Sequence, residues 1–235
     1  MLAIHTDAVR PQRSKDDGPG RTWGTFGYRM SHVKVLSSVA FLDWLRTPLP
    51  SRGDLLERGN GDGTRCERQL ILSNDYLENF KGAAGYQPYL MNDVHAPAAI
   101  KDAILCIGGL CAGAAYGPDW KSRVGLMSVQ ITQMNALNHR GEHNDLPSQG
   151  EFIASYTAHG SGNVLIEYTS EETPPADAFT SRNRRPCMVR RQEAGDFYTM
   201  AGPSLHPAQH AVYAHDDGRV SLTYRFKLLS VTGWG

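Results

Sequence analysis

The second half of the chain alternates hydrophobic and polar residues with the two-residue period of β-strands. The alternating segments are rich in β-branched and aromatic residues, and Gly, Pro, Asn and Asp separate them. A series of short strands bounded in this way is typical of a β-sandwich or barrel. The segments are MSVQITQM (127–134), FIASYTAHG (152–160), NVLIEYT (163–169), DFYTMAG (196–202) and RVSLTYRFKLLSV (219–231).

The first half of the chain predicts fewer strands. Residues 33–50 begin like a strand and continue as a short helix, with Ser37 or Ser38 as the candidate N-cap and Pro48 as the stop. The stretch QLILS (69–73) is the one clear strand before the middle of the chain.

A second helix is expected to begin at Pro97, with apolar residues at helical spacing until Gly108 and Gly109 weaken its end. The longest apolar stretch, 103–116, is too short and too glycine-rich to span a bilayer, so no membrane association is expected. Helices followed by a long series of strands indicate an α+β domain.

Composition sets the domain organisation and narrows the function. Residues 1–32 carry Pro, Gly, Ser, Lys and Asp with little periodicity, which predicts a flexible N-terminal arm before a single domain at 33–235. Lys plus Arg and Asp plus Glu both number 24, so the net charge does not indicate a protein that binds long nucleic-acid duplexes. The four cysteines lack paired C-x-x-C spacing. We expect a soluble, intracellular protein of the cytoplasm or nucleus, with its oligomeric state left open.

The stretch NHRGEHNDLP (138–147) can be interpreted as either of two metal sites. The first is H-x-x-E-H from His139 to His143, in which a helix would present two histidines to zinc and a glutamate as base. The second is H-x-D, in which His143 and Asp145 would supply two of the three protein ligands of an oxygen-activating iron.

Local sequence favours the second interpretation. Residues 127–131 alternate as a half-buried strand does. Gly141 would cost the zinc helix about 1 kcal/mol relative to Ala, and Pro147 would truncate it. On a strand, His143 and Asp145 point to one face and can converge on one ion. H-x-D alone is a weak signal, because a loop histidine beside a turn-forming aspartate has the same pattern.

The C-terminal region adds a third histidine and two arginines in a strand-like segment. Arg219 and Arg225 share a strand face at a separation of roughly 20 Å, so their side chains must lean toward each other to bind one short dianion. Arginine suits this role because its planar fork binds a carboxylate through two parallel hydrogen bonds. Either arginine alone would be better explained as an exposed residue in an ion pair.

Taken in order, these motifs resemble the AlkB-type family of iron(II)- and 2-oxoglutarate-dependent dioxygenases. The likeness covers roughly residues 68–229. It is carried by the YQPY loop before a Pro-started helix, the strand into HND, SYTAHGSGNVLIEY, HAV and GRVSLTYRF. The resemblance implies a double-stranded β-helix (jelly-roll) core with supporting N-terminal helices.

The resemblance also implies a metal site and a bound co-substrate. His143, Asp145 and His210 would bind Fe(II). His206 and His215 compete for the third place, but only His210 stands in the HAV context of the family pattern.

For 2-oxoglutarate, the resemblance implies that Arg219 anchors the distal carboxylate, while Arg225 lies near the metal-side carboxylate and Asp145. The family's N-x-Y contact with the co-substrate falls here on Thr132 and Met134, so both side chains have changed.

The resemblance further implies a substrate, an alkylated or methylated nucleobase of DNA or RNA that is single-stranded or flipped out of the stack. The loop KGAAGYQPYLMND (81–93) would form a lid over it, with Tyr86 and Tyr89 stacking on or hydrogen bonding to the base. Tyrosines near a Pro turn also often only pack against a sheet. Two alternatives stay open: a 2-oxoglutarate oxygenase that acts on a protein side chain or small molecule, and an inactive binding module with the same fold.

The insertion at 169–195 contains the only local basic cluster in the chain. Such a cluster could follow a phosphate backbone. A solvated surface loop balanced by Glu171, Glu172 and Asp177 explains it equally well. The cluster consists of Arg182, Arg184, Arg185, Arg190 and Arg191.

Overall fold

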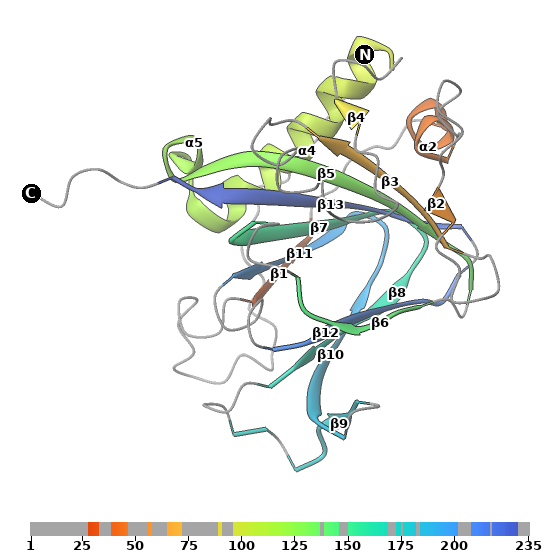
Figure 1. The fold of residues 1–235 in the computed structure, drawn as a ribbon, viewed down its shortest axis with the longest axis vertical. Coiled ribbons are helices and arrows are strands. Elements are labelled where there is room, and N and C mark those ends of the chain that lie inside the picture. The colour runs from red at the N-terminus through yellow and green to blue at the C-terminus, as the bar shows by residue number, and fades with distance from the viewer. Residues whose placement is uncertain are drawn as a thin grey trace, which may run out of the picture.

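Two β-sheets face each other, and the helices lie on the outer side of the larger sheet (Figure 1). The computed structural model describes residues 28–32, 39–46, 56–57, 65–71, 89–90, 96–136, 139–145, 150–168, 173–174, 176–181, 184–201, 208–216 and 218–229.

The larger, eight-stranded sheet has the order β1-β11-β7-β13-β5-β3-β2, with β4 paired in parallel to β3. The other pairs along this path are antiparallel. Its strands are β1 (Tyr28–His32), β2 (Leu56–Glu57), β3 (Arg65–Ile71), β4 (Tyr89–Leu90), β5 (Val124–Met134), β7 (Phe152–His159), β11 (Asp196–Ala201) and β13 (Arg219–Leu228).

The smaller, five-stranded sheet has the order β6-β12-β8-β10-β9 and is antiparallel throughout. Its strands are β6 (His139–His143), β8 (Gly162–Glu167), β9 (Phe179–Thr180), β10 (Pro186–Gln192) and β12 (His210–Ala214). The helices are α2 (Val39–Arg46), α4 (Ala98–Tyr116) and α5 (Trp120–Arg123).

The two faces of the larger sheet differ because its central strands β5 and β13 largely alternate apolar and polar residues. Apolar residues such as Val129, Tyr156 and Leu222 join α2 and α4 in the main hydrophobic core. Polar residues alternate with them on the opposite face, which also carries apolar residues such as Ile153 and Met200. Those polar residues are Gln130, Thr132, Ser155, Ser221 and Thr223, and all of them line one cavity.

Helix α4 differs from its prediction at the C-terminal end. It does not weaken at Gly108 and Gly109 but continues to Tyr116, and Gly117 follows with a φ of 81°. Packing explains the difference, because a Cβ on Gly108 would lie 2.7 Å from Cδ1 of the buried Tyr224 ring. The helix is long and apolar enough, by length and composition, to cross a membrane. Its buried residues nevertheless pack against the sheet, as those of a core helix do.

Replacing Gly108 with Ala is expected to lower the free energy of unfolding by about 1–3 kcal/mol through overpacking. Tyr224 cannot retreat easily, because its hydroxyl donates a 2.8 Å hydrogen bond to the Ile104 carbonyl. The matched control is Gly113→Ala, in which the added Cβ would make an ordinary 3.5 Å contact with Trp120. This variant should gain up to about 1 kcal/mol of stability from the higher helix propensity of Ala. Urea denaturation of both variants measures the difference, and equal stabilities would contradict this packing account.

The strand predictions for 127–134, 152–160, 163–169, 196–202 and 219–231 correspond to β5, β7, β8, β11 and β13. The H-x-x-E-H stretch forms strand β6, which agrees with rejecting the zinc helix. α2 also forms where a short helix is predicted, while the predicted cap and stop around it lie outside the described residues.

Other predictions meet a mixed outcome. The insertion at 169–195 is not only a loop: it contains β10, whose residues 187–192 form a continuous ladder with β8, and β9, which pairs with the start of β10. The last five residues of the predicted N-terminal arm form β1, which pairs with β11, while residues 1–27 lie outside the described part of the chain. Of the cysteines, Cys111 and Cys187 are buried free thiols and Cys106 is exposed.

Candidate metal centre and anion pocket

Two histidines and an aspartate meet where the two sheets face each other. His143 ends β6, Asp145 lies two residues beyond it, and His210 begins β12 opposite His143 in the antiparallel register. One ligand atom from each residue lies within 4.8 Å of the others. Nε2 of His210 is 3.5 Å from Oδ2 of Asp145, and the two imidazole centroids are 4.2 Å apart. Two imidazoles and one carboxylate are the donor set that leaves positions open on a non-haem iron.

The surroundings of these three side chains orient them. Nδ1 of His143 is 2.7 Å from the Gly141 carbonyl. A carbonyl only accepts, so this nitrogen carries the proton and Nε2 keeps its lone pair for a metal. Nη2 of Arg225 donates a 2.9 Å hydrogen bond to Oδ1 of Asp145, and both side chains are 3% exposed. The carboxylate is therefore held by one oxygen, while the other faces His210.

A second buried arginine, Arg219, is the first residue of β13, the strand that also carries Arg225. Arg219 is 1% exposed, and burial lowers the pKa of its guanidinium. Nη1 donates to the Ser221 hydroxyl and Nη2 to the Thr157 hydroxyl, both at 3.2 Å, and Thr157 in turn donates to Gln192. The hydroxyls of Ser221 and Thr157 are neutral acceptors, and Nε of Arg219 has no acceptor among the described residues. A buried charge without an opposite charge is costly, so this arginine is suited to bind an anionic ligand.

Two glycines, Gly160 after β7 and Gly162 at the start of β8, make room for this arginine. A Cβ on Gly162 would lie 3.0 Å from Nε of Arg219 and 2.3 Å from the Tyr213 carbonyl. Gly160 has a φ of 71°, and a Cβ there would lie 3.0 Å from Cα of Arg219. The turn can thus close over the guanidinium only because both side chains are absent.

One cavity joins the His-Asp-His cluster to Arg219. The register of β13 against β5 sets Arg219 opposite Met134 and Ser221 opposite Thr132. The cavity lining consists of Gln130, Thr132, Met134, His143, Asp145, Ile153, Ser155, Tyr198, Met200, His210, Val212, Arg219, Ser221, Thr223 and Arg225. The arginines do face one space, as their alternation predicts, but Arg225 is already engaged by Asp145.

For the remaining candidates the structure describes only part of what the prediction needs. Tyr86 and His206 lie outside the described residues. Tyr89 is described only as part of β4, where it pairs with Leu70 of β3. His215 is exposed just beyond β12.

Sequence reasoning missed several cavity residues. Tyr198 and Met200 lie on β11 opposite Ser155 and Ile153 of β7, so the alternation of DFYTM would have placed them on the cavity face.

The basic cluster of the insertion at 169–195 is partly neutralised, since Arg185 pairs with buried Glu167. The exposed Arg191 pairs with Glu193.

Comparison with solved structures identifies the fold. An oxidoreductase of the 2OG-Fe(II) oxygenase family from Burkholderia pseudomallei matches with a TM-score of 0.51 and 17% identity over 87% of this chain and 85% of that chain. SnoN, a non-haem α-ketoglutarate-dependent epimerase from nogalamycin biosynthesis, matches with a TM-score of 0.50 and 13% identity over 87% and 77%. No protein-family model and no curated protein matches the chain. The predicted α+β fold with a double-stranded β-helix core is confirmed.

Proposed function

We propose that this chain is an Fe(II)- and 2-oxoglutarate-dependent dioxygenase. One observation carries the proposal: a single cavity is lined both by a His-Asp-His cluster and by a buried arginine that has only neutral hydrogen-bond acceptors among the described residues. The cluster offers the ligands of an oxygen-activating iron. The arginine offers a bidentate site for a carboxylate.

The residues present fit both groups. His143, Asp145 and His210 would hold the metal through two imidazole nitrogens and one carboxylate oxygen, within the 4.8 Å spread of their atoms. Arg219 would receive the distal carboxylate of 2-oxoglutarate, whose charge offsets the buried guanidinium. When bound, iron and 2-oxoglutarate would use dioxygen to oxidise a substrate C–H bond, with one oxygen atom going to the substrate and the other to the succinate formed as 2-oxoglutarate loses carbon dioxide.

The protein's own groups orient and shield this site. Arg225 holds Asp145 by Oδ1, so that Oδ2 stays directed at His210 and the metal position. Ile153 and Met200 give the cavity apolar walls that limit entry of water. Thr132 offers a hydroxyl to the co-substrate, whereas Met134 beside Arg219 offers only apolar contact.

For the substrate, we propose an alkylated or methylated nucleobase in DNA or RNA, which the reaction would demethylate. The support is the likeness of the motif order, from the YQPY loop through HND to GRVSLTYRF, to the AlkB-type family. In this proposal Tyr86 and Tyr89 belong to the lid over the base.

A small molecule or a protein side chain is the second candidate substrate. The zero net charge favours it, because nucleic-acid binding usually relies on a basic surface. SnoN, one of the structurally similar proteins, is an epimerase from nogalamycin biosynthesis. An inactive binding module is the third candidate, and the presence of all three ligands and both arginines in one cavity argues against it.

Succinate formation separates these candidates. With Fe(II), ascorbate and 2-oxoglutarate, the purified chain is expected to form succinate slowly by itself and faster with oligonucleotides that contain methylated bases. Unmethylated oligonucleotides of the same sequence are the control. Stimulation by methylated peptides or small aromatic compounds, with none by nucleic acid, would overturn the nucleobase proposal. An absence of succinate under every condition would overturn the enzyme proposal.

A further inference from the structure

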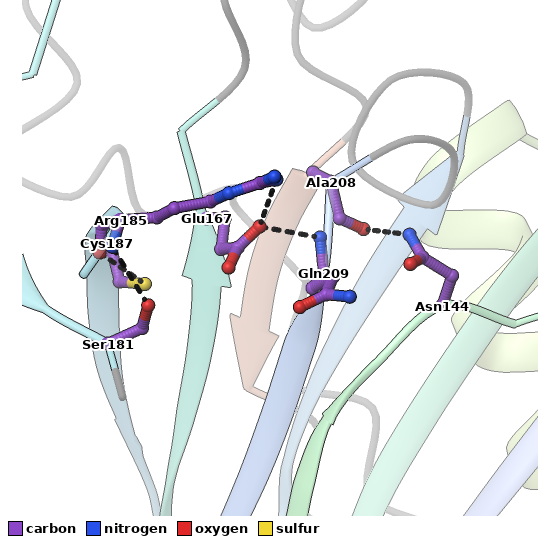
Figure 2. A network of polar contacts seen from close by, with 7 residues as sticks. All are labelled: Asn144, Glu167, Ser181, Arg185, Cys187, Ala208 and Gln209. Carbon is purple, nitrogen blue, oxygen red and sulfur yellow. Dashed lines mark hydrogen bonds and ion pairs between the residues drawn. The ribbon is translucent and has the colours of Figure 1, made fainter. Parts of the chain in front are cut away.

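A polar network joins β8 and the residues before β10 to the segment that precedes His210 (Figure 2). Its centre is Glu167 at the end of β8, a carboxylate that is 3% exposed. Oε2 accepts a 3.2 Å hydrogen bond from Nη1 of Arg185 and a 3.3 Å hydrogen bond from the backbone N–H of Gln209. The backbone N–H of Glu167 also donates to the Gln209 carbonyl at 2.9 Å. Glu167 therefore binds Gln209, the residue directly before His210, through both its side chain and its backbone.

The same short segment is tied to the H-x-D motif from its other side. Nδ2 of Asn144 donates a 2.9 Å hydrogen bond to the carbonyl of Ala208 (Figure 2). Only the amide nitrogen can donate to a carbonyl, so this assignment of the amide is unambiguous. Asn144 stands between His143 and Asp145, and Ala208 stands two residues before His210. The bond thus links two candidate ligands to the third without passing through the metal position.

The strand ladder does not by itself fix the three ligands. The pairing of β12 with β6 shifts register between His210 and Val212, right beside the candidate ligand. Asp145 lies beyond the end of β6, so it has no place in that ladder. A side-chain link across this irregular point is the contact that can set the spacing of the three groups.

We infer that Asn144 and Glu167 are positioning residues, which together hold the His-Asp-His set in a metal-ready arrangement before any ion binds. Asn144 sets the H-x-D turn against the 208–210 segment, and Glu167 sets that segment against β8. Groups that orient metal ligands from outside typically contribute tenfold to a hundredfold in metal affinity. The inference rests on the proposed metal site, since a positioning role has meaning only if the triad binds an ion.

The first test is Asn144→Ala, with Mn²⁺ affinity of the metal-free full chain measured by isothermal titration calorimetry. Asn144 is exposed, so the variant should fold with an unchanged melting temperature. Its Kd for Mn²⁺ is expected to rise roughly 10- to 100-fold. The matched control is Ser122→Ala, which removes another side-chain donor to a backbone carbonyl, that of Asp119, in a helix outside the cavity. An Asn144→Ala affinity equal to that of Ser122→Ala overturns the role of Asn144.

The second test compares two substitutions of Glu167. Glu167→Gln keeps an oxygen that can accept the Gln209 N–H, so its Mn²⁺ affinity is expected to stay near that of the unaltered chain. Glu167→Ala removes the acceptor and is expected to weaken Mn²⁺ binding by about tenfold or more. Glu151→Gln is the control, because that exposed carboxylate also accepts a backbone N–H, from Leu228, in the larger sheet. Equal affinities of the Ala and Gln variants at position 167 would overturn its positioning role.

Failure of the inference is distinguishable from failure of the proposed function. If the unaltered chain does not bind Mn²⁺ at all, the metal site itself is wrong. If the unaltered chain binds Mn²⁺, and the Asn144→Ala and Glu167→Ala variants bind it with the same affinity as the unaltered chain, the metal site stands and the positioning inference is wrong.

Discussion

Replacing Asp145 with Ala is expected to lower succinate formation by a factor on the order of 1,000 or more, because a bound metal supplies several kcal/mol of transition-state stabilisation. Asp145 is the only carboxylate in the described cluster, and its Oδ2 faces His210. Without it, two neutral imidazoles remain to hold the ion. The same substitution removes the 2.9 Å ion pair of Arg225, so mobility of that guanidinium should also increase.

The control for this variant is Asp102→Ala, which removes an exposed carboxylate on α4, a helix that packs on the outer side of the larger sheet. Its turnover should equal that of the unaltered chain. Melting temperatures of both variants show whether a loss of turnover reflects unfolding. A folded Asp145→Ala variant with full activity would place the catalytic metal elsewhere.

Replacing Arg219 is expected to have the second largest effect, on the KM for 2-oxoglutarate. Arg219→Met removes the charge that would bind the distal carboxylate, and truncating one partner of a buried charge pair costs about 2–5 kcal/mol or more. This corresponds to a rise in KM of at least roughly 30-fold. Mn²⁺ affinity should not change, because the Arg219 guanidinium bonds to Ser221 and Thr157, whereas the arginine that contacts Asp145 is Arg225.

Arg219→Lys and Arg191→Met complete this experiment. Lysine keeps the charge but lacks the planar fork, so it should recover only part of the affinity. Arg191 is exposed and paired with Glu193, so its loss should leave KM unchanged. A KM for 2-oxoglutarate that is insensitive to Arg219→Met would show that another group anchors the co-substrate.

The features that sequence could predict are those governed by strict alternation. The two-residue period of 219–225 places Arg219 and Arg225 on one face, and both line the cavity. The spacing of His143 and Asp145 likewise predicts convergence, and the structure brings both within 4.8 Å of His210. Local periodicity thus predicts which residues face inward once the strands are identified.

The features that escaped prediction depend on pairing between distant segments. The bond from Asn144 to Ala208 spans 64 positions and joins a residue just after β6 to a residue just before β12. The segment of β10 is predicted as part of an insertion, because arginines obscure its alternation. It forms a strand through its ladder with β8. Helix α4 passes through Gly108 because a tyrosine from β13 occupies the missing side-chain volume. None of these partners can be identified from local sequence.

The most direct test of the central claim is an anaerobic titration of the full chain with Fe(II) in the presence of 2-oxoglutarate, followed by visible absorption. The account predicts a metal-to-ligand charge-transfer band that saturates at one iron per chain, is absent in Asp145→Ala, and requires higher 2-oxoglutarate concentrations in Arg219→Met. A chain that remains folded but gives no such band at saturating iron and 2-oxoglutarate would contradict the account.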